Sequence, residues 1–296
     1  FGTAVKKVFS EYSITDCIIK AGEKSKDITN YATIMNALAK DKFSKKDTII
    51  TLGGGVVGDL GAFVASTYMR GITLIAMPTS LLADVDSSVG GKTAINLTEG
   101  KNLCGTFYQP DAVYINLEFL KTLPYREIKS GLGEILKYSF LNKNLSFDIE
   151  NITEQTIFNC LKIKAGIVEK DEFESGKRKL LNLGHTVGHA IEKLSDFSLS
   201  HGECVAKGIK AALIISRQYY DLDEQALKDF EKKAYKADID LSVCYSANEI
   251  AKKIESDKKG DAKSVDFILI DGCGLPQIVK LSIKNIRDYL ENGYKN

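Results

Sequence analysis

The stretch Thr48–Leu60, T-I-I-T-L-G-G-G-V-V-G-D-L, decides the fold class of this chain. Thr48–Leu52 is β-branched and apolar, which is typical of a buried strand, and the small apolar residues of Gly58–Tyr68 are typical of a tightly packed helix. Between them, Gly53–Gly58 matches G-x-G-x-x-G, in which glycines let the backbone approach a pyrophosphate at a helix N-terminus. This order predicts a dinucleotide-binding unit, with a glycine turn that serves packing alone as the alternative.

Further segments continue this alternation over about the first 120 residues. Ile28–Lys40 has helical periodicity, and the remaining strand-like segments are Cys17–Lys20, Ile72–Met77 and Ala112–Asn116. Strands separated by helices predict a Rossmann-like parallel sheet. No acidic residue ends the strand after the glycine turn, so a carboxylate for a ribose must come from elsewhere, and Glu23 is a candidate.

After Leu123-Pro124 the pattern becomes mostly helical. Helical periodicity covers Arg126–Asn142, Glu154–Asp171, His185–Leu194, Glu203–Tyr220 and Asp223–Tyr235. A β-hairpin is expected from Val265–Ile270 and Gln277–Leu281. The sequence therefore predicts an α/β domain over residues 1–122 and a mostly α-helical domain over residues 123–296.

Composition excludes several classes of protein. Apolar residues make up 44% and charged residues 27%, which is typical of a soluble globular chain. Lys and Arg (40) nearly balance Asp and Glu (39), so no excess charge indicates nucleic acid or an anionic membrane. No apolar run is long enough to span a bilayer. Six scattered cysteines without a C-x-x-C pair favour free thiols in a cytoplasmic protein.

All three histidines lie in one short stretch. His185 and His189 are four residues apart in N-L-G-H-T-V-G-H-A-I-E and share a helical face, and His201 opens H-G-E. Histidine suits both metal binding and proton transfer near neutral pH. Residue 186 is threonine, so the H-E-x-x-H pattern of metalloproteases is absent. The cluster predicts a reaction centre, against the alternative of buried histidines that only pack.

Two other motifs carry charged side chains beside glycines. In S-G-L-G-E-I-L-K-Y, Gly131 and Gly133 each cost a helix about 1 kcal/mol, which indicates close approach by a partner or ligand. Glu134 and Lys137 share a face there, and an exposed ion pair is the alternative. In D-V-D-S-S-V-G-G-K-T, Lys92 precedes a threonine, but the Walker spacing is absent, which excludes nucleotide hydrolysis; a polar capping loop is the alternative.

Together these motifs resemble the 3-dehydroquinate synthase family. The resemblance rests on G-G-G-V-V-G-D-L, T-Y-M-R-G-I, P-T-S-L-L-A-D-V-D-S-S-V-G-G-K-T, K-N-L-C-G-T-F-Y-Q-P, G-L-G-E-I-L-K-Y, L-N-L-G-H-T-V-G-H-A-I-E and H-G-E, in order from about residue 20 to about residue 275. Cys104 and Leu183 are mild departures from the pattern. The family's first strands are expected to lie upstream of Phe1.

The resemblance implies a role for each motif. Glu134, His185 and His201 would hold Zn²⁺, with Co²⁺ as a possible substitute, and His189 would face the substrate instead. The residues implied to line the NAD site are Glu23, Lys26, Gly53, Gly54, Gly55, Val56, Val57, Gly58, Asp59, Thr79, Ser80, Lys92 and Lys101. The residues implied to meet the substrate are Arg70, Asp86, Lys92, Asn102, Lys137, Lys164, Arg178, Asn182, His189 and Lys258, with Lys259 as the alternative to Lys258.

The activity that the resemblance implies is a lyase reaction of the shikimate pathway. 3-Deoxy-D-arabino-heptulosonate 7-phosphate would become 3-dehydroquinate and phosphate through transient oxidation by NAD, phosphate elimination, reduction and intramolecular aldol cyclisation. The family also implies a homodimer, in which Arg70 reaches the neighbouring subunit's phosphate site. The alternatives are another sugar-phosphate cyclase, a metal-dependent polyol dehydrogenase, and a catalytically inactive binding domain.

Overall fold

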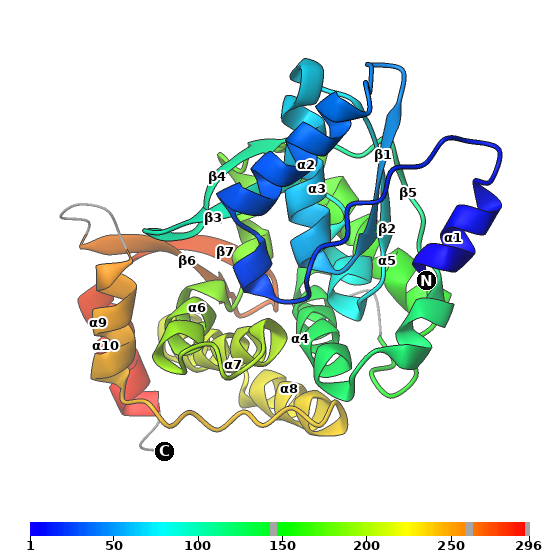
Figure 1. Ribbon diagram of the computed structural model, residues 1–296. Helices are drawn as coiled ribbons and strands as arrows, with labels where there is room; N and C mark the ends of the chain where they lie inside the picture. The colour runs from blue at the N-terminus through cyan, green and yellow to red at the C-terminus, as the bar shows by residue number, and fades with distance from the viewer. Residues whose placement is uncertain (143–146, 258–262, 294–296) are drawn as a thin grey trace. The chain divides into compact units, whose positions relative to one another are not determined.

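The computed structural model describes residues 1–142, 147–257 and 263–293, and Figure 1 labels its elements. The chain forms two compact units, Phe1–Leu123 and Pro124–Asn296. We call these the first and second units. The division lies one residue from the boundary predicted between residues 122 and 123.

The first unit is built on a parallel sheet in the order β1-β2-β5. Its strands are β1 (Thr48–Gly53), β2 (Thr73–Pro78) and β5 (Ala112–Val113). β1 pairs with β2 from Thr48↔Thr73 to Gly53↔Pro78, and β2 pairs with β5. Helix α3 (Gly55–Thr67) connects β1 to β2, so the predicted parallel β-α-β arrangement is confirmed.

Helix α2 (Ile28–Lys40) lies beside α3 and closes the core of the first unit (Figure 1). Asp27 caps α2, because its side chain accepts a hydrogen bond from the Asn30 amide at 2.8 Å. Ile34 and Leu38 of α2 belong to the same buried cluster as the α3 side chains. This packing holds α3, whose N-terminus carries the glycine turn at the end of β1.

Two parts of the first unit differ from the sequence prediction. The predicted strand Cys17–Lys20 is wrong: the segment is irregular and Ile18 is 93% exposed, so its apolar side chain has no core to face. The hairpin of β3 (Lys92–Leu97) and β4 (Gly100–Phe107) was not predicted. β4 is mostly exposed and rich in glycine and polar residues, so it lacks the apolar alternation of a half-buried strand.

The second unit is mostly helical, as predicted. Its helices are α4 (Tyr125–Leu141), α5 (Glu154–Val168), α6 (His185–Leu194), α7 (His201–Tyr220), α8 (Glu224–Lys236), α9 (Ala247–Ser256) and α10 (Ile283–Gly293). Helix α7 is buried along most of its length and packs against α4, α6, α8 and α10. It therefore forms the centre of the unit, to which the neighbouring helices bring their functional side chains.

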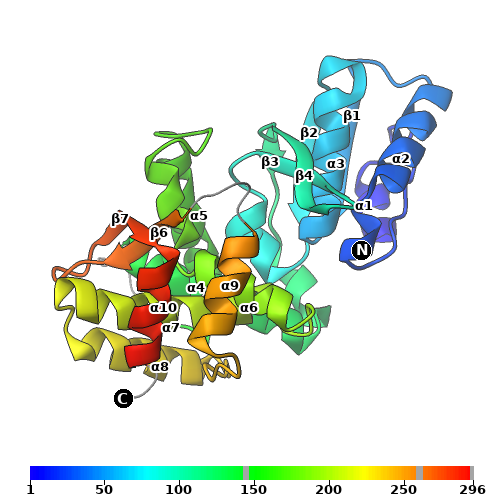
Figure 2. The ribbon, with the colours of Figure 1, turned by 90° about the vertical axis from the view of Figure 1, so that its left-hand side faces the viewer.

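The predicted hairpin is confirmed in the second unit. β6 (Ser264–Ile270) pairs antiparallel with β7 (Pro276–Ser282). Helices α9 and α10 were not predicted; they lie side by side, as Figure 2 shows. The first unit also begins with a short helix, α1 (Gly2–Val8). Among the described residues, no helix combines the length and the apolar character that crossing a bilayer requires.

Candidate functional site

Helix α4 carries a fully buried carboxylate at a point where it touches α7. Glu134 is 0% exposed. A Cβ added to the preceding residue, Gly133, would lie 2.1 Å from the Gly202 carbonyl oxygen, and one added to Gly202 would lie 1.8 Å from the Ser130 oxygen. Only glycines permit this approach, as the Gly133 motif indicated. The crossing fixes Glu134 next to His201, the first residue of α7.

A second glycine contact joins α6 to α7. Gly184, at the N-cap of α6, has a φ of +81°, and its carbonyl oxygen would lie 1.9 Å from a Cβ added to Gly208. One turn later, a Cβ on Gly188 would lie 2.8 Å from the Cys204 oxygen. The first turn of α6 therefore rests on the backbone of α7, which brings His185 to the same place as Glu134.

The nitrogens of two histidines meet the Glu134 carboxylate. His185 Nε2 lies 3.5 Å and His201 Nε2 lies 3.2 Å from Glu134 Oε1. His189 is the third member of the cluster, because each imidazole offers a ligand atom within 4.8 Å of the others. All three residues that the sequence implied as metal ligands are therefore brought together, with His189 beside them.

In each histidine that faces Glu134, the other ring nitrogen lies close to an oxygen on the far side of the ring. His185 Nδ1 lies 3.2 Å from the Leu183 carbonyl oxygen. His201 Nδ1 lies 3.5 Å from Glu192 Oε2. Metal-binding histidines usually have such a partner, which fixes the tautomer and aims the opposite nitrogen at the ion. Glu192 was missed in the sequence, although it lies three residues after His189 and so shares its helical face.

The charges in this cluster are strongly coupled. Burial would raise the pKa of Glu134, but Lys137 and then the two imidazoles outweigh it and hold that pKa well below its usual range. Burial lowers the pKa of His185 to about 3, and desolvation within the cluster lowers the pKa of His189, although the His189 side chain is exposed. Burial opposes protonation of His201 as well, but Glu134 and Glu192 raise its pKa to about 10. A bound cation would take the place of the His201 proton.

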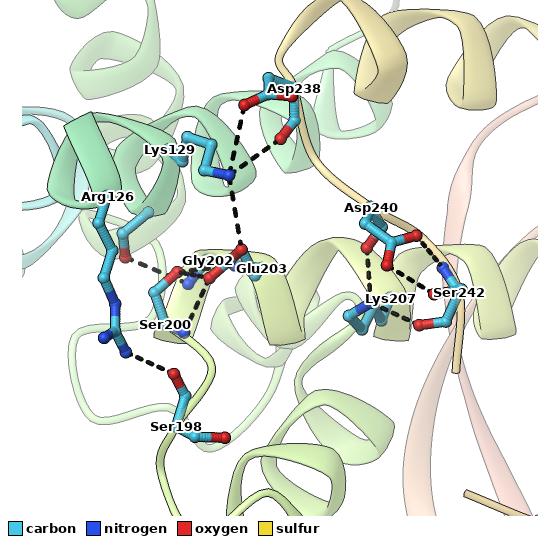
Figure 3. Close-up of polar contacts among 11 residues, drawn as sticks. Arg126, Lys129, Ser198, Ser200, Gly202, Glu203, Lys207, Asp238, Asp240 and Ser242 are labelled. Carbon is cyan, nitrogen blue, oxygen red and sulfur yellow. Dashed lines mark hydrogen bonds and ion pairs between the residues drawn. The ribbon is translucent and has the colours of Figure 1, made fainter. Parts of the chain in front are cut away.

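The start of α7 is anchored by a polar network, drawn in Figure 3. Ser200 and Glu203 form a capping box: the Ser200 amide and hydroxyl donate to Glu203 Oε2 at 2.9 and 2.6 Å. Arg126 Nη2 donates to the Ser198 carbonyl at 2.6 Å, and Lys129 Nζ lies 3.4 Å from Asp238 Oδ2. The Arg126 bond holds the loop before His201 against α4, and Lys129 joins α4 to the segment after α8.

Two predicted substrate residues lie in a loop organised by Asp171. Its carboxylate accepts hydrogen bonds from the Gly176 and Arg178 amides at 2.7 and 2.9 Å and from Ser175. The Arg178 side chain is buried and donates to the Glu172 carbonyl. Asn182 Nδ2 donates to Glu174 Oε1 at 2.6 Å.

Two predicted lysines of the second unit are buried. Lys137, on α4, is ion-paired with Glu134 Oε2 and both are buried, so the alternative of an exposed ion pair does not hold. Lys164 lies on α5. Lys258 and Lys259 fall outside the described residues.

In the first unit, the predicted nucleotide residues gather at the end of β1. Gly54 is the N-cap of α3 and has no side-chain cap bond. The Thr79 amide, after β2, donates to the Gly53 carbonyl at 3.0 Å, and Ser80 Oγ would lie 3.1 Å from a Cβ on Gly54. This end of the sheet is where parallel α/β folds bind ligands.

Lys26 joins two carboxylates of the predicted nucleotide site. Lys26 is buried, and its Nζ lies 2.9 Å from Asp59 Oδ2 and 3.4 Å from Glu23 Oε1. Asp59 and Lys92 also line one small cavity of the first unit. Glu23, Lys26 and Asp59 therefore form one cluster, although they come from a 3₁₀ turn (Glu23–Ser25) and the start of α3.

The other predicted residues of the first unit lie on turns and on the hairpin. Arg70 follows α3 with a φ of +65°, and Met69 before it has a φ of +49°. Asp86 lies in a π-helical turn, Ala83–Ser87, of a kind often found at functional sites. Lys101 and Asn102 are exposed on β4.

Comparison with known proteins agrees with this geometry. Residues 16–130 match the family model "3-dehydroquinate synthase N-terminal", and residues 131–260 match "3-dehydroquinate synthase C-terminal". A 3-dehydroquinate synthase of Alkaliphilus metalliredigens is 38% identical over 304 aligned residues, which cover 98% of this chain and 85% of the relative. One of Clostridium acetobutylicum is 40% identical over 292, which cover 94% and 82%.

Solved structures share the fold. A 2-deoxy-scyllo-inosose synthase complexed with carbaglucose-6-phosphate, NAD⁺ and Co²⁺ has a TM-score of 0.88 at 25% identity, over 99% of this chain and 87% of that one. A 2-epi-5-epi-valiolone synthase from Streptomyces hygroscopicus with NAD⁺ and Zn²⁺ bound has a TM-score of 0.86 at 20% identity, over 99% and 89%. The chain belongs to the 3-dehydroquinate synthase family.

Proposed function

We propose that this protein is a 3-dehydroquinate synthase, a phosphate-eliminating carbon–oxygen lyase of the shikimate pathway. It would convert 3-deoxy-D-arabino-heptulosonate 7-phosphate into 3-dehydroquinate and phosphate, for aromatic amino acid biosynthesis. The observation that carries the proposal is the buried Glu134 carboxylate facing Nε2 of both His185 and His201. Relatives with this name cover most of the chain at about 40% identity.

The residues present fit a divalent ion. Ligands about 2.1 Å from a tetrahedral Zn²⁺ lie roughly 3.4 Å from one another, and the two observed nitrogen–oxygen distances are 3.5 and 3.2 Å. One carboxylate and two imidazoles leave a position for substrate, the arrangement of a catalytic site. We assign Glu134, His185 and His201 to Zn²⁺, with Co²⁺ as a substitute. When bound, the ion would supply Lewis acidity at a substrate hydroxyl, and NAD would supply a reversible hydride acceptor.

The first unit offers the groups that NAD needs. Gly53, Gly54 and Gly55 leave room for a pyrophosphate at the start of α3. Glu23 has a carboxylate to accept hydrogen bonds from ribose hydroxyls, with Lys26 beside it. The remaining residues assigned to the cofactor are Val56, Val57, Gly58, Asp59, Thr79, Ser80, Lys92 and Lys101.

In the second unit, buried cations suit a sugar acid that carries a carboxylate and a phosphate. The Arg178 guanidinium has the planar geometry for a carboxylate, and Asp171 holds its backbone in place. Lys164 and Lys137 add positive charge in buried positions. His189 lies exposed beside the two imidazoles assigned to the metal and would take part in proton movement at the substrate. Asn182 would orient it or a water.

In the first unit, Lys92 and Arg70 would neutralise phosphate. Asp86 would accept hydrogen bonds from sugar hydroxyls, and the Asn102 side-chain amide would both accept and donate them. Arg70 would serve a neighbouring copy in a homodimer. A cytoplasmic location is part of the same proposal, since all six cysteines are free thiols.

A phosphate-release assay tests the proposal. With the heptulosonate phosphate, NAD and Zn²⁺, phosphate should be released without net accumulation of NADH absorbance, and omission of either cofactor should stop it. Net NADH accumulation would indicate a polyol dehydrogenase instead. Turnover restricted to sugar phosphates without a carboxylate would indicate another cyclase. A folded, metal-loaded protein with no turnover would contradict the proposal and favour a binding domain.

A further inference from the structure

Asn96 lies at an irregularity near the end of strand β3. The β3–β4 register runs to Ile95↔Cys104 and resumes at Leu97↔Gly100, so Asn96 stands outside the ladder. Such bulges redirect a side chain and are frequent next to active sites. The half-buried Asn96 therefore has no paired residue in the β3–β4 ladder.

The Asn96 amide contacts two predicted ligand-binding residues at once. Its Nδ2 donates to Glu23 Oε1 at 2.8 Å, and its Oδ1 accepts from the Asn102 backbone amide at 2.9 Å. A carboxylate only accepts and a backbone N–H only donates, so these partners determine which way the amide faces. Aspartate would keep the second contact and lose the first.

The backbone of Asn96 reaches the same cluster. Its N–H donates to the Lys26 carbonyl oxygen at 2.7 Å, and Asn96 forms an isolated parallel bridge with Asp27. Lys26 Nζ in turn contacts Glu23 and Asp59. Asn96 therefore ties the turn that carries Glu23 and Lys26 to the hairpin that carries Asn102.

We propose that Asn96 is a positioning residue for NAD and substrate, an inference that rests on the proposed function. Its side chain holds the Glu23 carboxylate in one rotamer, so less conformational entropy is lost when a ribose binds. Its bond to the Asn102 amide also supports that residue's left-handed backbone, which has a φ of +57°. One amide thus couples the cofactor turn to the predicted substrate loop.

The test compares Asn96→Asp with the wild-type chain by calorimetric titration with NAD. The substitution removes the donor to Glu23 and sets two carboxylates against each other, so NAD affinity should fall about tenfold. Its KM for the heptulosonate phosphate should stay within about twofold of wild type, whereas Asn96→Ala, which loses both contacts, should raise it. Asn285→Asp, an exposed change on α10, is the control, and circular dichroism checks folding.

A cycle with Glu23→Gln shows whether Asn96 acts through Glu23. If it does, Asn96→Asp adds little loss of NAD affinity in the Glu23→Gln background. Equal losses in both backgrounds, or an affinity of Asn96→Asp equal to that of the wild type, would overturn the inference. Wild-type protein that binds no NAD would instead overturn the proposed function on which it rests.

Discussion

Among the residues that the structure describes, each unit has one completely buried carboxylate, and the pKa values of the two shift in opposite directions. Glu134 of the second unit and Asp84 of the first are both 0% exposed. Burial raises the pKa of Asp84 to about 8, and no charged neighbour contributes to the shift. Burial acts on Glu134 too, but Lys137 and the imidazoles hold its pKa well below the usual range.

The difference shows that burial alone does not make a metal site. A buried carboxylate without a cation takes up a proton, whereas one paired with a cation, as Glu134 is with Lys137, stays charged and suits a metal ion. Asp84 lies in the π-helical turn, and neither of its oxygens has a hydrogen-bond partner among the described residues. Glu134 stands where two glycine contacts bring three helices together. The experiments below alter one member of this comparison at a time.

The largest effect is expected for Asp84→Asn at alkaline pH. The folded-state pKa is about 8 and the unfolded one about 3.9, so the folded state keeps a proton that the unfolded state releases. Stability should therefore fall by up to about 1.4 kcal/mol per pH unit between roughly pH 4 and pH 8, and level off above. Melting curves recorded at pH 5, 7 and 9 should show this fall in stability for the wild-type protein and not for Asp84→Asn.

The exposed Glu11→Gln controls for the loss of one negative charge. A wild-type slope that persists in Asp84→Asn would contradict this account of Asp84.

Lys137→Met should leave the Glu134 carboxylate buried without its lysine partner, as Asp84 is buried without a cation. Removing one partner of a buried ion pair costs about 3–5 kcal/mol, to be measured by urea unfolding of metal-free protein. Lys121→Met breaks an exposed pair with Glu118 and should cost less than about 1 kcal/mol. Similar losses for the two lysines would show that Lys137 does not compensate a buried charge.

Gly202→Ala should disturb the crossing of α4 and α7. The new Cβ would lie 1.8 Å from the Ser130 carbonyl oxygen, and overpacking of this kind costs about 1–3 kcal/mol. The shift should also weaken Zn²⁺ binding. Gly166→Ala on α5 meets no atom within 4 Å and should instead stabilise the helix by up to about 1 kcal/mol. Zinc affinity unchanged in Gly202→Ala would separate the crossing from the metal centre.

The smallest effect is expected for Glu192→Gln. It removes the charge behind His201 Nδ1 while keeping the size of the side chain, so Zn²⁺ affinity should fall about 10–100-fold. Glu231→Gln, in a half-exposed pair with Lys210, is the matched control. Competition with a chelating dye measures both affinities, and equal values would remove Glu192 from the site.

The sequence predicted the parallel sheet, the change to helices after Leu123 and the histidine cluster, because each is written in local periodicity or in residue spacing. It missed the β3–β4 hairpin, whose exposed strand has no apolar pattern. The contacts of Glu192 and Asp171 were also missed, because they depend on how helices and loops pack. Glycine at 133 signalled a close approach, and only the structure identified Gly202 as its partner.

The most direct measurement is a calorimetric Zn²⁺ titration of metal-free wild-type protein and of His201→Ala. We predict one ion per wild-type chain, released protons, and no measurable binding by the variant, whose folding is checked by circular dichroism. Equal stoichiometry and affinity for both proteins would contradict the assignment of Glu134, His185 and His201 to the metal.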